Sequence, residues 1–399
     1  MSRFSLPYQV GGEETHVQYL ATHLSSRHNV TVFSSNEKSF GQRTKVATPA
    51  SVASNGNFTT CYLDVRFGSI RFETECYDVV HLHGYHRVFM DLLVSRLSRQ
   101  RKKMVSTLHG SVQSSHLDAK WGSARHRSVA IMKLMHDRTL CTLALRKFSR
   151  IIALSNIERD FLVNEMRIPK DRTVVIPNGV PDEAFEELHE ESNVLNPLNK
   201  ELGFNPLEEP FIISIGRLSR EKCFHHAIMT LPSLPRDIQY VIIGWDQGEL
   251  PSLKLIADKL HLKHRVHFIL TTKAQKYSLL SHALALILPS HHEGQPIVVL
   301  EAMARGCPVI AARTGGQAEL IREGRIGYTY EWANLRQLES LIRRFYEDAN
   351  LRREMEKRPN HIRKNSAGQR SSTESASFMI MSLEDRSFGM RCSRLFRRD

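Results

Sequence analysis

The chain has 399 residues, 41% of them hydrophobic, and a formal net charge of +13 at pH 7. Such a length allows large buried cores and predicts two or three domains. No apolar run reaches the roughly 18 residues that a membrane-spanning helix needs, and the segment that starts at Met1 lacks the pattern of a signal peptide. The six cysteines are scattered without a CxxC pair. This spacing favours reduced thiols in a cytoplasm over a disulfide framework or a zinc site.

Short strand-like segments alternate with helical patterns in two series, which is typical of parallel βαβ units. The expected fold class is α/β, with two doubly wound, Rossmann-like parallel-sheet domains facing a cleft. In the first domain, 1–182, strands are expected at Val30–Ser34, Val79–His83, Met104–Leu108, Ile151–Leu154 and Val174–Pro177. In the second domain, 210–355, strands are expected at Phe211–Ile215, Tyr240–Ile243, Val266–Ile269, Ala285–Leu288 and Val309–Ala311. Residues 183–209 are acidic and polar, and their Asn-Pro pairs at Asn196 and Asn205 predict a linker.

Two motifs of the first domain lie near helix or strand ends. Gly11-Gly12 precedes a helix expected to begin near Glu14, and its unhindered amides suit an anion, although the pair also suits a tight turn. His109 follows the strand Met104–Leu108. An imidazole there can donate to a sugar hydroxyl or carry a proton near neutral pH, although a lone histidine is more often structural.

No sequence spacing predicts a metal site. His81 and His83 alternate on an expected strand, a pattern that more often gives polarity at a strand end than metal ligation. The chain has no Asp-x-Asp pair, a common metal-binding motif. We therefore expect neither a metal nor another cofactor.

Positive charge is concentrated between His86 and Arg150, where 14 Lys or Arg face three Asp, a balance of +11. Such a segment attracts phosphates at a membrane surface or on nucleic acid. No nucleic-acid-binding motif accompanies it, so we expect no nucleic-acid partner. Within a helix expected over Arg125–Phe148, the apolar residues of Ser128–Met135 lie beside cations, as in an interfacial helix. The open alternative is that these apolar residues form core and the cations are only solvated.

A glycine and two cations follow the first strand of the second domain. Phe211–Ile215 runs directly into the segment Gly216-Arg217-Leu-Ser219-Arg-Glu-Lys222. Ser219 suits a helix cap, so backbone amides and both cations are expected together at one strand end. Arginine offers a bidentate fork and lysine a point charge, which suits a diphosphate. A surface turn with solvated cations is the open alternative.

Two glutamates, Glu293 and Glu301, are separated by seven residues. Glu293 is expected in a loop after an apolar strand, and Glu301 on a helix that Pro296 can start and Gly306 can end. An ionised carboxylate against a buried surface needs hydrogen-bond partners. Two acceptors that grip different hydroxyls of one extended ligand fit better than a glycosidase pair, whose carboxylates lie about 5 to 9.5 Å apart. A solvated Glu301 paired with Arg305 is the open alternative.

The last motif, Thr314-Gly315-Gly316, follows the strand Val309–Ala311. It is expected to offer unhindered amides near the same sheet edge, unless it is only a tight turn. Periodicity is then lost after Met355, and residues 356–399 mix serines with arginines. We expect this tail to be disordered or atypical.

Together, these motifs resemble the retaining glycosyltransferases of family 4, which have the GT-B fold. The resemblance covers roughly Pro7 to Met355 and lies, in this order, in Pro7–Gly12, Thr107–Gly110, Ile176–Gly179, Gly216–Lys222 and Glu293–Gly306. It implies a hexosyl-type glycosyltransferase with a nucleotide-diphosphate sugar as its donor. It also implies transfer to an acceptor with retained anomeric configuration and without a required metal.

The resemblance implies a role for each site residue. Glu301 would bind the donor ribose and Glu293 the transferred sugar, while Gly12 would lie beside the phosphates. The implied catalytic residues are His109, which would approach the donor sugar, Glu293, and the diphosphate-holding Arg217 and Lys222. The implied donor-binding residues are Gly11, Gly12, Gly216, Arg217, Lys222, Glu293, Gly294, Gln295, Pro296, Ile297, Glu301, Gly315 and Gly316.

The chain departs from the family pattern at both ends and within two motifs. Only six residues precede Pro7, so the first strand is expected to be clipped, and the usual C-terminal crossing helix is not recognisable after Met355. Cys223 stands where glycine is usual, and Gln295 where an aromatic residue or leucine is common. An inactive or weak nucleotide-sugar-binding relative and a GT-B sugar-nucleotide epimerase are therefore alternatives. A phosphate-binding protein of membrane or nucleic-acid surfaces is a third.

The expected location is cytoplasmic, with peripheral attachment to an anionic membrane at the inner face of the plasma membrane as a hypothesis. It rests on the +11 segment, which belongs to the domain that faces the acceptor in the resembled family. The acceptor is accordingly expected to be lipid-linked or itself anionic, as in glycan or glycolipid biosynthesis. The residues do not identify the base or the sugar of the donor.

Overall fold

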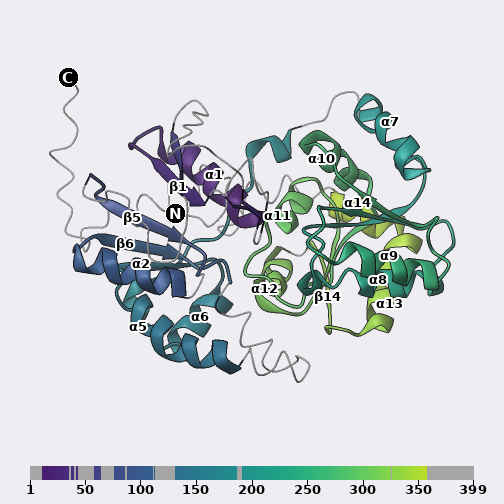
Figure 1. Ribbon diagram of the computed structural model, residues 1–399. Helices are drawn as coiled ribbons and strands as arrows, with labels where there is room; N and C mark the ends of the chain where they lie inside the picture. Colours follow the sequence, from purple (N-terminus) through teal and green to yellow (C-terminus); the bar gives the residue numbers. More distant parts are fainter. Residues whose placement is uncertain are drawn as a thin grey trace. The chain divides into compact units, whose positions relative to one another are not determined.

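The computed structural model describes residues 11–35, 37–39, 42–43, 58–63, 76–85, 88–110, 112, 131–186, 191–324 and 326–356. Within them the chain forms two compact units, the first ending at Gly179 and the second beginning at Val180 (Figure 1). Each unit is built on a parallel sheet, which confirms the expected α/β class. The expected first strand, the basic residues 113–130 and the tail 357–399 lie outside the described residues. No described helix is both long and apolar enough to cross a membrane.

The first unit alternates strands and helices along the chain. Its elements are α1 (Gly12–Leu24), β1 (Thr31–Ser35), β2 (Glu37–Ser39), β3 (Gln42–Arg43), β4 (Thr59–Leu63), β5 (Val79–His83), α2 (Val88–Arg99), β6 (Lys103–Thr107), the π-helical turn η1 (Asp137–Cys141), α5 (Thr142–Leu145), β7 (Arg150–Ala153), α6 (Asn156–Asn164), η2 (Lys170–Arg172) and β8 (Thr173–Val175). Strands β5, β6, β7 and β8 form a parallel sheet in that order. β1 pairs in parallel with β4, and β2 pairs antiparallel with β3.

The sheet of the first unit has helices on both faces. Side chains alternate across a strand, so neighbouring residues enter different cores. Met104 and Ile151 pack with α2 and α5 in one core. Val105 and Ile152 pack with Leu20 of α1 in the other. Helix α1 therefore covers the sheet face opposite α2 and α5, and this places its first turns beside β5 and β6.

The second unit, teal to yellow in Figure 1, has a larger sheet. Its elements are η3 (Asp182–Phe185), α7 (Glu191–Leu202), β9 (Phe211–Ile215), η4 (Arg220–Lys222), α8 (His225–Thr230), η5 (Leu231–Ser233), β10 (Gln239–Ile243), α9 (Leu250–Lys259), β11 (Val266–Ile269), α10 (Lys273–His282), β12 (Ala285–Leu288), α11 (Ile297–Ala304), β13 (Val309–Ala312), α12 (Gly315–Gly324), β14 (Gly327–Tyr330), α13 (Leu335–Glu347) and α14 (Ala349–Glu356). The strand order is β11-β10-β9-β12-β13-β14, with every pair parallel.

This strand order locates the ligand-binding edge of the second unit. Counted from β9, it is the 3-2-1-4-5-6 order of doubly wound folds, and it reverses between β9 and β12. Ligands of such sheets bind beyond the carboxyl ends of the strands at this switch point. Ile213 and Leu286 face a core with α7, α10, α11 and α12. Their neighbours Ile212 and Ile287 face a core with α8, α9 and α13.

The predicted linker is wrong for residues 191–202, which form helix α7. Leu195, Leu198 and Leu202 recur at helical spacing and are buried in the core beside α10. Pro197 lies inside the helix and costs about 3 kcal/mol there. Burial of a leucine contributes about 1.5 to 3 kcal/mol, so three leucines outweigh the proline that predicted a chain break.

Most predicted strands coincide with observed ones. β5, β9, β11 and β12 have the expected bounds, and the other predicted strands differ by one or two residues at one or both ends. β14 was not predicted, because Gly327-Tyr-Thr-Tyr330 is no apolar run. It pairs with β13 so closely that a Cβ on Gly327 would lie 1.8 Å from the carbonyl oxygen of Val309. The helix expected over Arg125–Phe148 is present at residues 131–145, with η1 as a π-helical turn inside it.

Candidate functional site

The loop after β9 is held at the switch point by backbone contacts. Gly216 N donates to Ile243 O over 2.9 Å, which continues the β9–β10 ladder by one residue. A Cβ on Gly244 would lie 1.8 Å from the carbonyl oxygen of Gly216, so only glycine allows this approach. The segment Gly216–Lys222 therefore leaves the sheet at the edge predicted from the strand order.

The turn that carries Lys222 differs in one respect from the prediction. Ser219 precedes η4, but its hydroxyl donates to Arg217 O over 3.4 Å and does not cap the turn. Cys223 ends the turn with φ of 51°, in the left-handed region that favours glycine. This conformation is the physical reason why glycine suits that position. Burial raises the pKa of the Cys223 thiol to about 11.

Lys222, in the loop after β9, and Glu293, in the loop after β12, form an ion pair. Lys222 Nζ lies 2.5 Å from Glu293 Oε1, and each side chain is 15% exposed. Burial by itself raises the pKa of Glu293, but the charge of Lys222 and its hydrogen bond outweigh burial, and the pKa is lowered. Glu293 is thus ionised at neutral pH and neutralised by a cation from β9's loop.

Backbone hydrogen bonds fix the loop that contains Glu293. His291 N donates to Glu221 O over 2.9 Å and joins this loop to η4. Gly316 N, one of the amides expected to be unhindered, donates to Glu293 O over 2.9 Å. Gly315 has φ of 55°, and a Cβ there would lie 2.2 Å from the same Glu293 oxygen. The glycine pair therefore positions Glu293 by close backbone approach.

Helix α11 follows this loop, and the residues at its two ends are close to the predicted ones. Pro296, predicted as the first helical residue, is the N-cap, so the helix begins one residue later, at Ile297. Arg305 is the C-cap, and Gly306 follows with φ of 72°. Gly294 and Gln295 complete the connection between Glu293 and the helix. The predicted strand, loop and helix are confirmed.

Glu301 is buried, with 5% of its surface exposed, and it has a lysine partner that the sequence did not indicate. Lys276 Nζ of α10 lies 2.6 Å from Glu301 Oε1, and Tyr277 OH donates to the same oxygen over 3.4 Å. Arg305 instead donates to Glu186 O over 2.5 Å and lies 4.0 Å from Glu191. The alternative of a Glu301–Arg305 pair is wrong, because α7 and the preceding chain draw the arginine away. Lys276 was missed, since only the tertiary fold joins α10 to α11.

Arg217 is the most exposed cation of this group. Its side chain is 40% exposed, and its guanidinium lies 3.9 Å from Glu221, which is 51% exposed. A surface pair of this length contributes little and is screened by salt. Arg217 is therefore able to turn toward an incoming anion at small energetic cost.

In the first unit, a buried carboxylate holds the backbone at His109. His109 and Gly110 have φ of 53° and 73°, both in the left-handed region. Glu158 of α6 accepts from Gly110 N and from Leu154 N, each over 2.7 Å. Burial raises the pKa of Glu158, and these two hydrogen bonds oppose that rise. No sequence signal singled out Glu158, because it is an ordinary helical residue until β6 and β7 are brought together.

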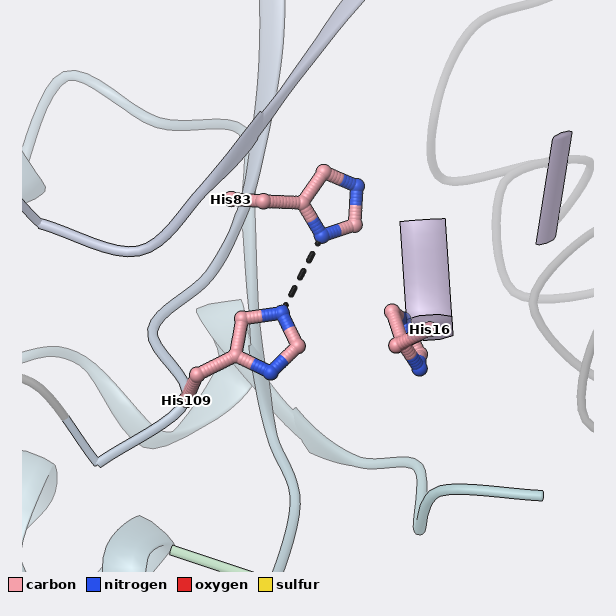
Figure 2. A group of neighbouring side chains, drawn as sticks. All are labelled: His16, His83 and His109. Carbon is pink, nitrogen blue, oxygen red and sulfur yellow. Dashed lines mark hydrogen bonds between the residues drawn. The ribbon is translucent and has the colours of Figure 1, made fainter. Parts of the chain in front are cut away.

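His109 lies in a histidine cluster (Figure 2). His83 Nδ1 and His109 Nε2 are 3.2 Å apart, and the ring centroid of His16 lies 5.5 Å from that of His83 and 5.0 Å from that of His109. His81 stacks on His83 at 4.0 Å and contacts Thr107 Oγ1 through Nε2. Burial lowers the pKa of His16 to about 4 and lowers that of His83 well below its usual range. The predicted Gly11-Gly12 pair begins α1, one turn before His16.

Comparison with protein families covers both units. Residues 10–184 match the model described as Glycosyltransferase Family 4, and residues 198–361 match the model described as Glycosyl transferases group 1. The chain belongs to glycosyltransferase family 4. The site loops of both units fall inside the matched residues of this family 4 chain.

Relatives and solved structures agree with this membership. The UDP-Gal:alpha-D-GlcNAc-diphosphoundecaprenol alpha-1,3-galactosyltransferase of Escherichia coli is 27% identical over 264 residues, 64% of this chain and 63% of that protein. The chain spans between 55% and 63% of the length of three curated relatives that it matches. Sucrose-phosphate synthase from Thermosynechococcus elongatus aligns with a TM-score of 0.76 at 18% identity over 95% of this chain and 94% of its own. Anabaena HepE with UDP-glucose aligns with a TM-score of 0.64 at 21% identity over 77% and 79%. At these identities the two structures support the GT-B fold alone.

Proposed function

We propose that this protein transfers a hexosyl-type sugar from a nucleotide-diphosphate sugar to an acceptor, with retained anomeric configuration and without a required metal. The observation that carries the proposal is the Lys222–Glu293 ion pair at the switch point of the second sheet. Family membership supports sugar transfer. The complex of HepE with UDP-glucose supports a nucleotide-sugar donor.

Donor binding would rearrange the Lys222–Glu293 pair. A diphosphate carries more negative charge than one carboxylate, so Lys222 would turn to the phosphates, where Arg217 adds a bidentate contact. Glu293 would then accept hydrogen bonds from the hydroxyls of the transferred sugar. Charge grows on the diphosphate as it departs, and the two cations would stabilise that charge.

Glu301 would hold the ribose of the donor. Its contacts with Lys276 and Tyr277 both fall on Oε1. The second oxygen, Oε2, would accept from ribose hydroxyls in hydrogen bonds to a charged group, which contribute about 1.5 to 3 kcal/mol. Lys276 would hold the Glu301 carboxylate in place for this contact. His109, held by Glu158, remains a proposed catalytic residue of the first unit.

Radiolabelled UDP-, GDP- and ADP-sugars test the proposal with the purified protein. Saturable binding of one donor is expected, with transfer to an acceptor or slow hydrolysis of the donor. Arg217→Ala and Lys222→Ala are expected to lower turnover by about 100- to 1000-fold and to weaken donor affinity much less. Lys263→Ala is the matched control, because Lys263 is 70% exposed and pairs with Asp258 on the surface. Absence of saturable binding for all three donors would contradict the proposal.

We also propose a lipid-linked or anionic acceptor at an anionic membrane surface. Ile131, Met132 and Met135 are 52%, 68% and 65% exposed, so the alternative that they form core is wrong. Leu140 and Leu143 extend this apolar surface and are also exposed. The acceptor named for the E. coli relative is linked to diphosphoundecaprenol, which supports a lipid-linked acceptor for this chain.

Sedimentation with vesicles tests the membrane proposal. Recovery with anionic vesicles at low salt is expected to exceed recovery with neutral vesicles and to fall as salt rises, because each basic residue contributes about 1 kcal/mol. Met132→Gln/Met135→Gln is expected to reduce recovery. Leu255→Gln, at a 53% exposed leucine of the second unit, is the control. Equal recovery with both vesicle types would refute membrane attachment.

A further inference from the structure

Three histidines from three separate elements of the first unit lie side by side (Figure 2). His16 comes from α1, His83 from the end of β5, and His109 from the segment after β6. One ring nitrogen of each lies within 4.8 Å of the corresponding nitrogens of the other two. Their separations of 67 and 26 residues along the chain hide this arrangement from any local spacing rule.

The spacing of the nitrogens suits a transition-metal ion. Zinc binds imidazole nitrogen at about 2.0 to 2.1 Å, and in a tetrahedral site this places two such nitrogens about 3.3 Å apart. His83 Nδ1 and His109 Nε2 are already 3.2 Å apart. The third nitrogen needs a shift of about 1 to 1.5 Å to reach the same spacing. His16 is 9% exposed, and its Nε2 has no hydrogen-bond partner among the described residues.

The chemistry of the ligand set selects the class of ion. Three imidazoles with no carboxylate suit Zn²⁺, Cu²⁺, Ni²⁺ or Co²⁺, whereas Mg²⁺ and Ca²⁺ require oxygen ligands. A metal binds the neutral imidazole, and burial keeps His16 and His83 in that form at neutral pH by lowering the pKa of each. Three protein ligands leave one tetrahedral position open.

We propose that His16, His83 and His109 bind one divalent transition-metal ion, and that the bound ion inhibits sugar transfer by occupying the imidazole of His109. Metal binding is independent of the proposed function, whereas inhibition rests on it. The proposal does not make the ion a cofactor. The histidine cluster is instead proposed as an inhibitory site, at which bound Zn²⁺ stops sugar transfer.

Binding is tested with Zn²⁺ by calorimetry and with Co²⁺ by its visible absorption, both without donor. The wild-type chain is expected to bind one equivalent at this site. His16→Ala and His83→Ala are each expected to weaken binding by at least about 10-fold, since second-shell losses alone reach that value. His267→Ala is the matched control, because His267 lies in the second unit and contacts Gln239. The proposed metal site is refuted if the wild type binds no Zn²⁺ saturably. It is also refuted if both cluster variants bind Zn²⁺ with the affinity of the wild type.

Two further measurements keep the result interpretable. Circular dichroism checks that each variant is folded. If an alanine variant is unfolded, His16→Asn or His83→Gln takes its place. Zn²⁺ is expected to raise the unfolding temperature of the wild type and not that of the cluster variants, since a ligand of the native state stabilises it. A rise of the same size in the cluster variants overturns the site.

Inhibition is tested in the transfer assay with Zn²⁺, with Mg²⁺ and after addition of a chelator. Loss of transfer is expected at the Zn²⁺ concentration that fills the site, with recovery on chelation and no effect of Mg²⁺. If sugar transfer is unchanged when Zn²⁺ fills the site, the proposed inhibition is refuted, whereas the proposed metal site is not. A wild-type chain that binds no donor refutes the proposed function and with it the inhibition, while the binding measurements still decide the site.

Discussion

Glu293 and Glu301 are the two carboxylates of the second unit's proposed donor site, 15% and 7% exposed at their side chains, and each has its own lysine. Lys222 comes from η4 and Lys276 from α10, so different elements neutralise the two charges. An isolated buried carboxylate would be strongly destabilising. Each glutamate thus has a counter-charge and is available as an acceptor for ligand hydroxyls. Arg305, the nearest cation in sequence to Glu301, instead anchors the chain around α7.

The Lys222–Glu293 pair is expected to show strong coupling in stability. Lys222→Met leaves Glu293 without its counter-charge and is expected to lower the free energy of unfolding by about 3 kcal/mol at pH 7. Lys222→Met/Glu293→Gln removes both charges and is expected to recover most of that loss. Urea unfolding followed by circular dichroism measures both variants. Equal losses in the single and double variants would contradict a charge-pair role.

The pH dependence of stability follows from the lowered pKa of Glu293. Because its folded pKa is below the ordinary value of 4.5, ionised Glu293 stabilises the fold fully above about pH 4.5. This contribution is lost as the pH falls through the folded pKa. Wild type is therefore expected to exceed Glu293→Gln in stability at pH 7 and to approach it in acid. A difference in the free energy of unfolding that stays constant from pH 7 to pH 3 would be evidence against this linkage.

Among the elements, α6 has a positioning role in the first unit. Ser155 caps the helix by accepting from Glu158 N, which begins the helix at the end of β7. The Glu158 side chain then accepts from the backbone of both strand-end segments, at Leu154 and at Gly110. The start of one helix thus sets the backbone of His109, a residue 49 positions earlier in the chain.

Glu158→Ala is expected to impair catalysis through the placement of His109. Two backbone N–H groups lose their acceptor, at about 1 to 3 kcal/mol each. Turnover is expected to fall at least about 10-fold, while donor affinity changes little because the proposed donor grip lies in the second unit. Glu158→Gln, which keeps one acceptor oxygen, is expected to lose less.

Ser155→Ala is the control for a purely structural effect at α6. It removes the helix cap and is expected to cost about 1 kcal/mol of stability. Its turnover at a temperature where the protein is folded should match that of the wild type. If Glu158→Ala and Ser155→Ala lose stability and turnover in the same proportion, Glu158 is structural and does not position His109.

At the scale of the whole molecule, the two units have separate hydrophobic cores. The cores on either face of the second sheet draw their residues from Val180 onward, and the cores of the first unit end at Ile176. Helix α7 belongs to the second unit, since Leu195 lies in the core that includes β9 and α10. A boundary placed after α7 would cut through a packed core.

This predicts a specific difference between two fragments. Residues 180–356 are expected to fold alone and to unfold cooperatively in urea. Residues 210–356 lack Leu195, Leu198 and Leu202, each of which contributes about 1.5 to 3 kcal/mol by burial. The shorter fragment is therefore expected to have a clearly lower urea midpoint or to be unfolded. Equal midpoints would show that α7 does not stabilise the second unit.

The sequence by itself determined much of the fold. Apolar runs such as Phe211–Ile215 and Ala285–Leu288 predict buried parallel strands with correct bounds, because both faces of such strands are covered. The motifs after these strands contain Lys222 and Glu293. The common direction of the strands was enough to predict that both motifs lie at one edge of the sheet. These features depend on local composition and on the common direction of parallel strands. Both can be inferred from the order of apolar and polar segments in the sequence.

Only the tertiary structure decided which side chains meet. Lys276 pairs with Glu301, Glu158 holds Gly110, and three histidines converge although they are distant in the chain. Tertiary burial also turned the Asn-Pro segment around Pro197 into helix, since the leucines beside it outweigh the local propensity. Such contacts depend on how separate elements pack, and no local periodicity or spacing encodes the packing partner of a helix.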